Sequence, residues 1–572
     1  MIKVKLSSLR KGIVLFTFIA IILLLCFYPL FGRISYDVQL TPPDIYHMLP
    51  KSFWLYLAVI QVFLVVQQLF SRGKAEITLT GLFLTAILPW LLYGALPISQ
   101  FPSIYTINDA VYHLANARKV VMDGGLQAPA QDYLQYPGTS FLMAFLSNTT
   151  GITEGTSLLA FGIVLNFVFV LSIAFMLLWI GKRILGPDTG FLLPIIYLLG
   201  NTTFFTQFCP QNFALTLYFL SMLIFIYPKK QTTSSKHMLF MLTLVSSTLV
   251  MTHPITNLFN MSTLFMLFVI QKISKKQIGL KLSLPFFLFE AIITFLWWVI
   301  FATENFNIAI DALFTLLKPS PWSNLPDLFM LQSPSFLSHV LSIFSRSFYA
   351  FTGIVALCGM AFFLFRRQER IEVLVGIFLG ILSIGIFPFL LFGGEWADRV
   401  LLFVYFPVSG LAVYGLNILF SARTGGSKRR FDVYYRKVLV CILVALIPLA
   451  FMYHHQYDSI ENANAWDFSV TKFLVQFSPS QSIALPWSPG MRAEYSYYNP
   501  NIVDLKTFTE WYWDPEIIVF SVKVARVYEY TQGNSTAYVN EMISYASSIP
   551  VNRFYDNRFT MAYAVTNLTR TE

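Results

Sequence analysis

Charged side chains are scarce in this sequence. They make up 12% of its 572 residues, whereas soluble globular domains usually carry about 25%. Hydrophobic residues reach 56%, and the mean hydropathy is +0.62. A chain with so little charge cannot cover its core with a water-facing surface, so the composition excludes an ordinary soluble protein. The four cysteines do not predict a disulfide framework.

Several common motifs are also missing. The sequence has no P-loop, no G-x-S-x-G, no dinucleotide fingerprint and no zinc-type spacing of cysteine and histidine. The missing nucleotide motif argues against an ATP-driven pump. The net charge of +10 would be compatible with nucleic-acid binding in a soluble protein. Here the basic residues lie in short segments between apolar runs, so we expect no nucleic-acid partner.

Long apolar runs are what the sequence has instead. Runs near 20 residues match the length that crosses about 30 Å of hydrocarbon. They predict an all-α polytopic membrane protein with about 13 transmembrane helices. The short pair at 238–252 and 254–271 is also compatible with a hairpin that does not fully cross. The predicted spans are 13–31, 52–70, 77–97, 156–180, 189–206, 212–228, 238–252, 254–271, 281–301, 348–365, 371–392, 400–420 and 437–454.

The basic residues predict the orientation of these spans. With the N-terminus in the cytoplasm, the inner segments carry 24 Lys and Arg and the outer loops carry 7; the other 8 of the 39 lie in the tail. Cytoplasmic loops are enriched in basic residues. We therefore expect a multi-pass cell-membrane protein with a cytoplasmic N-terminus and an extracytoplasmic C-terminus.

The predicted outer regions divide the chain into two parts. Residues 1–454 form the transmembrane domain, with long outer loops at 98–155 and 302–347. Residues 455–572 are less apolar and predict a small extracytoplasmic C-terminal α+β domain. There "EIIVFSVKVARVYEY" alternates like a strand, and "RFYDNRFTMAYAV" predicts a hairpin around Asp556 and Asn557.

The stretch "TINDAVYHLANARKVV" (106–121) in the first outer loop is the strongest candidate for chemistry. Placed on a helix, its polar residues share one face, which predicts a short amphipathic helix at the interface. Asp109 would take a proton from an acceptor hydroxyl or hold a divalent cation. The alternative is that Asp109 only caps the helix, in a box that begins at Thr106. The polar residues of this face are Asn108, Asp109, Tyr112, His113 and Asn116.

Ionisable residues also lie at the predicted ends of later spans. Glu395 and Arg399 lie at the outer mouth of the span at 400–420, where Arg399 would bind a phosphate or pair with a nearby acid. His253, in "VMTHPITN", would face the same cavity or complete a turn defined by proline. Glu290 lies inside an apolar run, where ionisable residues are functional candidates by default.

These motifs resemble the GT-C superfamily of membrane glycosyltransferases. "NDAVYHLANA" looks most like a D-x-x-Y-H stretch of archaeal oligosaccharyltransferase subunits, and "LQYPGTSFLMAFLSNTTGI" is similar to the segment that follows the first loop in many members. "DRVLLFVYFPVSGLAVYGL" resembles the family's R-[FY]-L-L-x-x-x-P run. Two features depart from the family. The acidic outer loop follows the third predicted span, whereas in many members it follows the first span. In addition, "EWYWDPE" replaces the W-W-D-Y-G signature, which argues against en bloc transfer of an oligosaccharide to Asn.

The resemblance implies a function and a mechanism. The expected enzyme is an inverting glycosyltransferase of the hexosyltransferase type. It moves a sugar from a polyprenyl-phosphate donor to a glycan, lipid or protein acceptor on the outer face. Asp109 is the implied base, and Arg399 and His253 hold the phosphate. Tyr112, His113, Asn116 and Glu395 would contact the substrates. A divalent cation, Mg or Mn, is a further expectation, with Asp109, Asp123 and Asp132 as its possible ligands.

Two other functions fit parts of the pattern. A transporter or flippase of lipid-linked saccharides would use the same cavity and the same basic residues, but broken helices and repeated halves, which favour such a protein, are not evident in the sequence. A non-catalytic membrane scaffold would leave the polar face of residues 108–116 unexplained.

Overall fold

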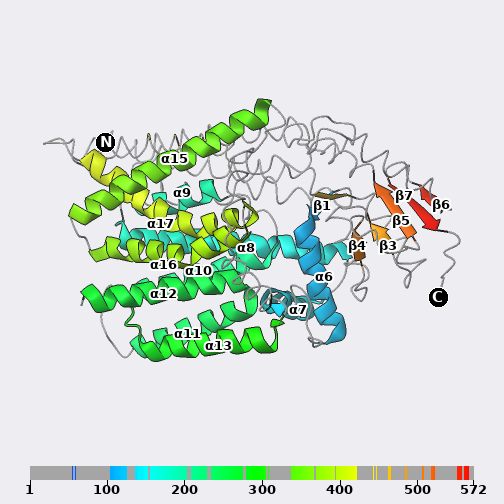
Figure 1. The fold of residues 1–572 in the computed structure, drawn as a ribbon, viewed down its shortest axis with the longest axis horizontal. Coiled ribbons are helices and arrows are strands. Elements are labelled where there is room, and N and C mark those ends of the chain that lie inside the picture. The colour runs from blue at the N-terminus through cyan, green and yellow to red at the C-terminus, as the bar shows by residue number, and fades with distance from the viewer. Residues whose placement is uncertain are drawn as a thin grey trace, which may run out of the picture.

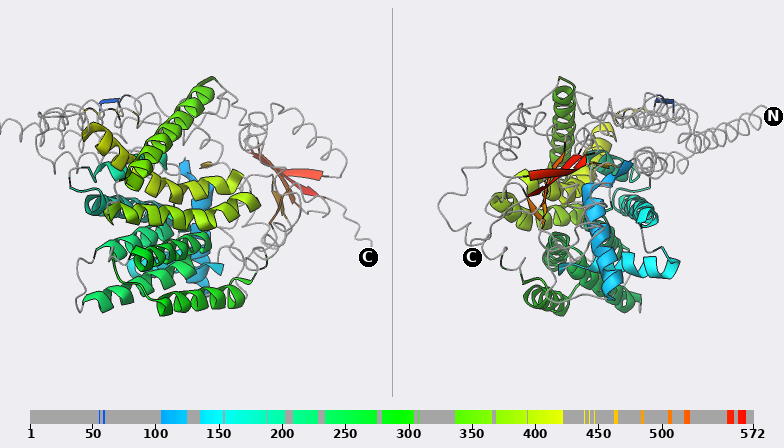
Figure 2. Two further views of the ribbon diagram at one scale, coloured as in Figure 1. Left: turned by 60° about the vertical axis from the view of Figure 1, so that its left-hand side comes forward. Right: turned by 90° about the vertical axis from the view of Figure 1, so that its right-hand side faces the viewer.

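The described part of the chain is a helical bundle with a small sheet at one end (Figures 1 and 2). In this computed structural model, the described residues are 104–124, 135–152, 155–187, 189–201, 208–227, 234–274, 279–303, 336–365, 369–392 and 394–421, with six strands of the tail and a few isolated positions. The predicted spans at 13–31, 77–97 and 437–454, and nearly all of 52–70, lie outside them.

Eleven helices are described along this part of the chain. Lipid offers no hydrogen-bond partners to the backbone, whereas a helix satisfies its backbone hydrogen bonds internally. Apolar runs in a membrane therefore fold as helices. The helices are α6 (Asn108–Asp123), α7 (Gly138–Thr150), α8 (Gly155–Ile184), α9 (Leu192–Gly200), α10 (Pro210–Ile226), α11 (Ser234–Thr252), α12 (Pro254–Ser274), α13 (Leu284–Ile300), α15 (Phe336–Phe365), α16 (Glu369–Phe392) and α17 (Gly394–Ser421).

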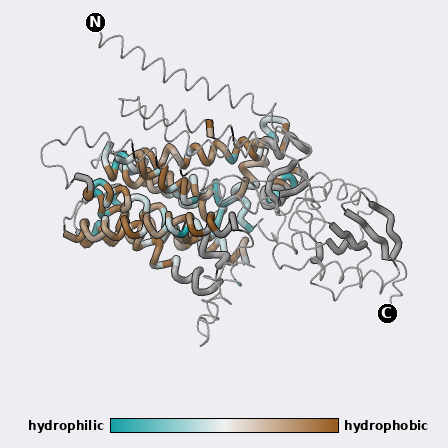
Figure 3. The backbone as a smooth tube through the Cα atoms, turned by 90° about the horizontal axis from the view of Figure 1, so that it is seen from above, coloured by the Kyte–Doolittle hydropathy of each residue, from teal (hydrophilic) through white to brown (hydrophobic). Residues whose placement is uncertain are grey.

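Four stretches within these helices are long and apolar enough to cross a membrane, which supports a polytopic membrane protein. They are Phe161–Ile184, Pro254–Ser274, Ile343–Phe365 and Val400–Leu419. Figure 3 shows the hydrophobic colour along most of the bundle. The apolar parts of α10, α11 and α13 are shorter, and each contains 17 residues. A helix of that length measures about 25 Å, close to the minimum for a crossing.

One predicted span is much shorter as a helix. The run at 189–206 contains α9, which has only nine residues. Every residue of α9 is buried, so its apolar sequence reflects a position inside the bundle and not a surface that faces lipid. Hydropathy alone does not distinguish these two environments.

Aromatic packing holds α9, α10, α12 and α17 together. Tyr218 of α10 meets Phe403 of α17 edge to face, with ring centroids 5.3 Å apart. Phe259 of α12 lies 4.5 Å from Phe403, and Tyr197 of α9 lies 5.4 Å from Phe219. Buried aromatic pairs in this geometry stabilise a fold beyond the area they bury. These four helices are therefore fixed relative to one another.

The tail contributes two strand arrangements. β2 (Asn462–Asn464) pairs antiparallel with β1 (Ile104–Ile107), which directly precedes α6. The other strands form one mixed sheet in the order β4-β3-β5-β7-β6. The antiparallel pairing of β6 with β7 confirms the predicted hairpin. Strand bounds in this sheet are β3 Ile483–Leu485, β4 Leu505–Thr507, β5 Ile517–Ser521, β6 Val551–Asp556 and β7 Thr560–Val565.

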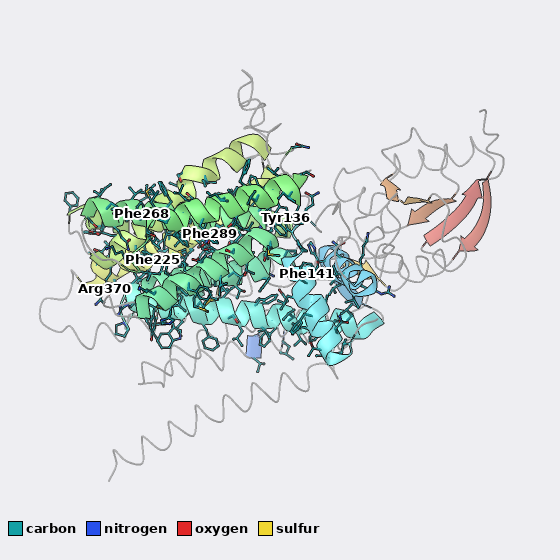
Figure 4. The ribbon with its side chains drawn as sticks, turned by 90° about the horizontal axis from the view of Figure 1, so that it is seen from below. Tyr136, Phe141, Phe225, Phe268, Phe289 and Arg370 are labelled. Carbon is teal, nitrogen blue, oxygen red and sulfur yellow. The ribbon has the colours of Figure 1, made fainter. Side chains whose placement is uncertain are left out.

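The two ends of the bundle differ in what they carry. Tyr136 and Phe141 lie at the end nearest the sheet, whereas Phe225, Phe268 and Arg370 lie at the opposite end (Figure 4). The first outer loop and the sheet of the tail, which the sequence predicts to be on the same side of the membrane, therefore lie at the same end of the bundle. The assignment of that end to the outer face of the membrane stays a prediction.

Candidate active site

The candidate site is centred on α6, the helix that the sequence predicts at 108–121. The helix begins at Asn108, directly after β1. Thr106 lies within β1, and Asp109 is the second helical residue. Asp109 thus lies in the first turn of α6, where it fits both the capping and the chemical interpretation.

The middle of α6 is buried against the bundle. His113 is only 7% exposed, and Leu114 and Ala117 are fully buried. Asn116 is half-buried, and its amide nitrogen has no hydrogen-bond partner. The side of α6 that carries His113, Leu114 and Ala117 therefore packs against the protein. The helix is present where the sequence predicts it, and its position at the membrane interface stays a prediction.

The helix α6 packs against α8 at a glycine. A Cβ atom added to Gly162 would lie 2.9 Å from Cδ2 of Leu114, closer than two carbon atoms normally approach. Leu114 thus occupies the space that a side chain at Gly162 would need. One turn further along α8, the Asn166 carboxamide oxygen accepts a hydrogen bond of 2.8 Å from Asn212 of α10. This contact connects the support of α6 with the core of the bundle.

The segment Gln135–Gly138, which leads into α7, is fixed by two helices, α11 and α13. The Trp297 indole N–H of α13 donates to the carbonyl of Gln135 at 3.0 Å. A Cβ on Gly138 would lie 2.5 Å from the hydroxyl of Thr252, the last residue of α11. Between them, burial raises the pKa of the Tyr136 hydroxyl above its usual range, so Tyr136 stays neutral. Sequence reasoning noted this segment only as a family-like motif.

His253 joins α11 and α12 and has a structural role in this turn. Its Nδ1 accepts a hydrogen bond of 3.3 Å from the backbone N–H of Thr256 and lies 3.0 Å from the Thr256 hydroxyl. An acceptor Nδ1 places the proton of the neutral ring on Nε2. The turn defined by proline is therefore present, and Nε2 is the atom with which His253 would donate to a phosphate.

Glu395, Asp398 and Arg399 lie in the first two turns of α17; their side chains are outside the described part. Arg399 precedes Phe403 by one turn, or about 6 Å of helix. His253 precedes Phe259 by six residues, or about 9 Å. Since Phe259 and Phe403 pack together and both helices start at the same end, the structure brings the backbones of His253 and Arg399 to one end of the bundle.

The acidic residues of the first loop do not form one metal site in α6. Asp109 and Asp123 are the second and last residues of this helix. Their backbones are about 21 Å apart along the axis, which no single ion bridges at ligand distances near 2 to 2.6 Å. Among the described residues, no group of three or more His, Cys, Asp and Glu is suited to hold a metal. Asp132 lies outside them.

Comparison with known proteins identifies the fold. No protein-family model and no curated protein matches the chain. An archaeal oligosaccharyltransferase, AglB from Archaeoglobus fulgidus, solved with an inhibitory peptide and a dolichol-phosphate, is similar in structure. The two share 12% identity over 87% of this chain and 75% of that chain, with a TM-score of 0.50.

Two other solved structures are also similar. One is ArnT from Cupriavidus metallidurans bound to undecaprenyl phosphate, with 12% identity, a TM-score of 0.47, and coverage of 86% of this chain and 97% of that one. The other is the mycobacterial arabinofuranosyltransferase AftD, with 11% identity, a TM-score of 0.43, and coverage of 87% and 40%. AglB therefore supports a similarity of fold, and the resemblance to GT-C glycosyltransferases remains what the motifs of the sequence imply.

Proposed function

We propose that this protein is a membrane glycosyltransferase. It moves one sugar from a polyprenyl-phosphate donor to a hydroxyl-bearing glycan, lipid or protein on the outer face. The observation that carries the proposal is the position of α6. The helix that bears Asp109 is held between a strand of the tail and Gly162 of α8. The helix α6 lies at the end of the bundle where α12 begins (Figure 1), and His253 directly precedes α12.

The donor would enter from the lipid and bind through its phosphate. Guanidinium binds phosphate with two parallel hydrogen bonds, which suits Arg399 to this role. The Nε2–H of His253 would add a further donor. Both groups would stabilise the charge that develops on the phosphate as the sugar leaves.

Asp109 would act as the base. It would take the proton of the acceptor hydroxyl while that oxygen attacks the anomeric carbon from the face opposite the phosphate. The bond between the anomeric carbon and the phosphate oxygen then breaks, polyprenyl phosphate leaves with the bonding electrons, and the configuration inverts. Tyr112 and His113, one turn or less from Asp109, and Asn116 and Glu395 would orient the sugar and the acceptor. Asp109 and Asp123 do not fit one ion, so a divalent cation at Asp109 would need Asp132 or another ligand.

Sugar transfer in reconstituted membranes tests the proposal. Radiolabelled polyprenyl-phosphate sugars would be supplied to native protein and to Asp109→Asn, which keeps the size of the side chain and removes its charge. Loss of a general base costs about 10²- to 10⁴-fold in rate. Glu372→Gln, in the first turn of α16, is the matched control and should transfer at the native rate.

The outcomes separate the competing functions. Equal transfer by native protein and Asp109→Asn would return Asp109 to a structural role. If native protein transferred no sugar from any donor but moved labelled lipid-linked saccharide between leaflets, the chain would be a flippase. If it did neither, the scaffold alternative would remain.

A further inference from the structure

A carboxyl group is buried in the middle of α13, away from the proposed active site. Glu290 is 1% exposed, and neither of its carboxyl oxygens has a hydrogen-bond partner. Its neighbours Leu288, Phe289 and Ile292 are exposed and cover the side of α13 that faces lipid. Since α13 packs against α11 and α12, Glu290 faces the interior of the bundle.

A second unpartnered oxygen belongs to a residue that is hydrogen-bonded one helical turn along α13 from Glu290. Asn257 of α12 is fully buried and donates through Nδ2 to the hydroxyl of Thr294 at 3.0 Å, while its Oδ1 has no partner. Thr294 follows Glu290 by one helical turn, which puts their Cβ atoms about 6 Å apart. Glu290 and Asn257 therefore place three oxygens that lack a donor about one helical turn apart in the same buried region.

Among the described residues, the helices that pack against α13 supply no positive charge at this depth. The described basic residues of α11 and α12 are Lys236, His237 and Lys272, which are all exposed. The Asn257 amide is neutral in either orientation, so it would not cancel the charge of a carboxylate. An ionised carboxylate without a counter-charge is very costly inside a membrane.

We propose that Glu290 and Asn257, supported by Thr294, form a binding site for one small cation inside the membrane-spanning bundle. Oxygen atoms without donors suit a hard, compact positive charge. Two sources have this chemistry: a proton bound to the carboxyl group, and a sodium ion held between the carboxylate and the Asn257 oxygen. The site is independent of sugar transfer and needs neither Asp109 nor Arg399.

Labelling with dicyclohexylcarbodiimide tests this site in the full chain in lipid nanodiscs. This apolar reagent enters the membrane and modifies protonated carboxyl groups, and mass spectrometry locates the product. Labelling at Glu290 would be compared in sodium chloride and in choline chloride of equal ionic strength. Sodium at ten times its dissociation constant would slow labelling about elevenfold, because only the unoccupied fraction reacts. Equal labelling in both salts identifies the proton as the occupant. No labelling of Glu290 in either salt overturns the proposal.

Variants show whether Asn257 belongs to the site. Asn257→Leu should abolish protection by sodium. If the proton is the occupant, the protonated carboxyl group would donate to the Asn257 oxygen, and loss of that hydrogen bond in the variant should change the labelling rate about fivefold. A rate that is unchanged in both salts overturns the two-residue site. Thr294→Val removes the support of Asn257 and replaces Asn257→Leu if that variant does not fold. Glu290→Gln must remove the label, and Glu372→Gln, a half-buried carboxyl of α16, must leave it in place.

Discussion

Leu114 of α6 fills the space beside Gly162 of α8, with its Cδ2 atom 2.9 Å from the place a Cβ of residue 162 would occupy. This contact lies five residues beyond Asp109, on the helix that we propose carries the catalytic base. The two positions are 48 residues apart in the sequence. A change at Gly162 should therefore act on catalysis through the position of α6, without a direct contact to substrate.

Gly162→Leu should move α6 away from α8. Overpacking typically costs about 1 to 3 kcal/mol of stability, and a shift of about 1 Å at a reacting group costs about 100-fold in rate. Sugar transfer at saturating donor would measure the effect. Leu114→Ala in the same chain should restore much of the rate, since it vacates the space. A double variant as slow as Gly162→Leu would contradict this explanation. Gly353→Leu, with open space around residue 353, is the control.

Trp297→Phe should loosen the end of the first loop. The substitution keeps the ring but removes the N–H that donates to Gln135, leaving a carbonyl without its partner. We expect a loss of about 1 to 3 kcal/mol in the free energy of unfolding, measured as a lower midpoint of thermal denaturation in detergent. Trp179→Phe changes an exposed tryptophan of α8 and should leave the midpoint unchanged. Equal midpoints for both variants would show that the bond contributes nothing.

Arg399→Lys tests how the donor phosphate is held. Lysine keeps the charge but not the two parallel donors of guanidinium. Because Arg399 would bind the donor phosphate and also stabilise the charge that develops on it, KM for the donor should rise and kcat should fall. Arg399→Gln should raise KM further. A fall in kcat at unchanged KM would instead indicate that Arg399 acts only on the leaving phosphate in the transition state.

The sequence predicted several helices within a few residues, but α15 (Phe336–Phe365) begins twelve residues before the predicted span at 348–365, inside the predicted loop 302–347. The predicted span at 254–271 matches α12 (Pro254–Ser274), because Pro254 fixes its start and the run that follows is long enough for lipid. It did not predict the nine-residue α9, since a helix buried in protein is as apolar as one that faces lipid. Hydropathy measures preference for an apolar environment and does not identify which one.

The candidate site was less accessible from the sequence. The polar pattern of residues 108–116 located the helix, and the R-[FY]-L-L-type run located Arg399. The partners that hold the helix were missed. Gly162 and Trp297 do not interrupt the apolar pattern of their spans. Only the folded chain shows that Gly162 packs against Leu114 and that Trp297 donates to the carbonyl of Gln135. Contacts between helices depend on rotation and depth, which one sequence does not specify.

The tail strand should matter for the active site as well. β2 pairs with β1 in the register Ile104 with Asn464 and Ile107 with Asn462, immediately before α6 begins. Ala463→Pro would remove a backbone donor and fix φ near −65°, which disfavours an extended strand. We expect slower sugar transfer and faster proteolytic cleavage before α6, because the strand that leads into the helix loses its partner. Ala463→Val, which favours a strand, should keep both properties. If Ala463→Pro behaved like Ala463→Val, the pairing would not support α6, and the contact with Gly162 alone would position the base.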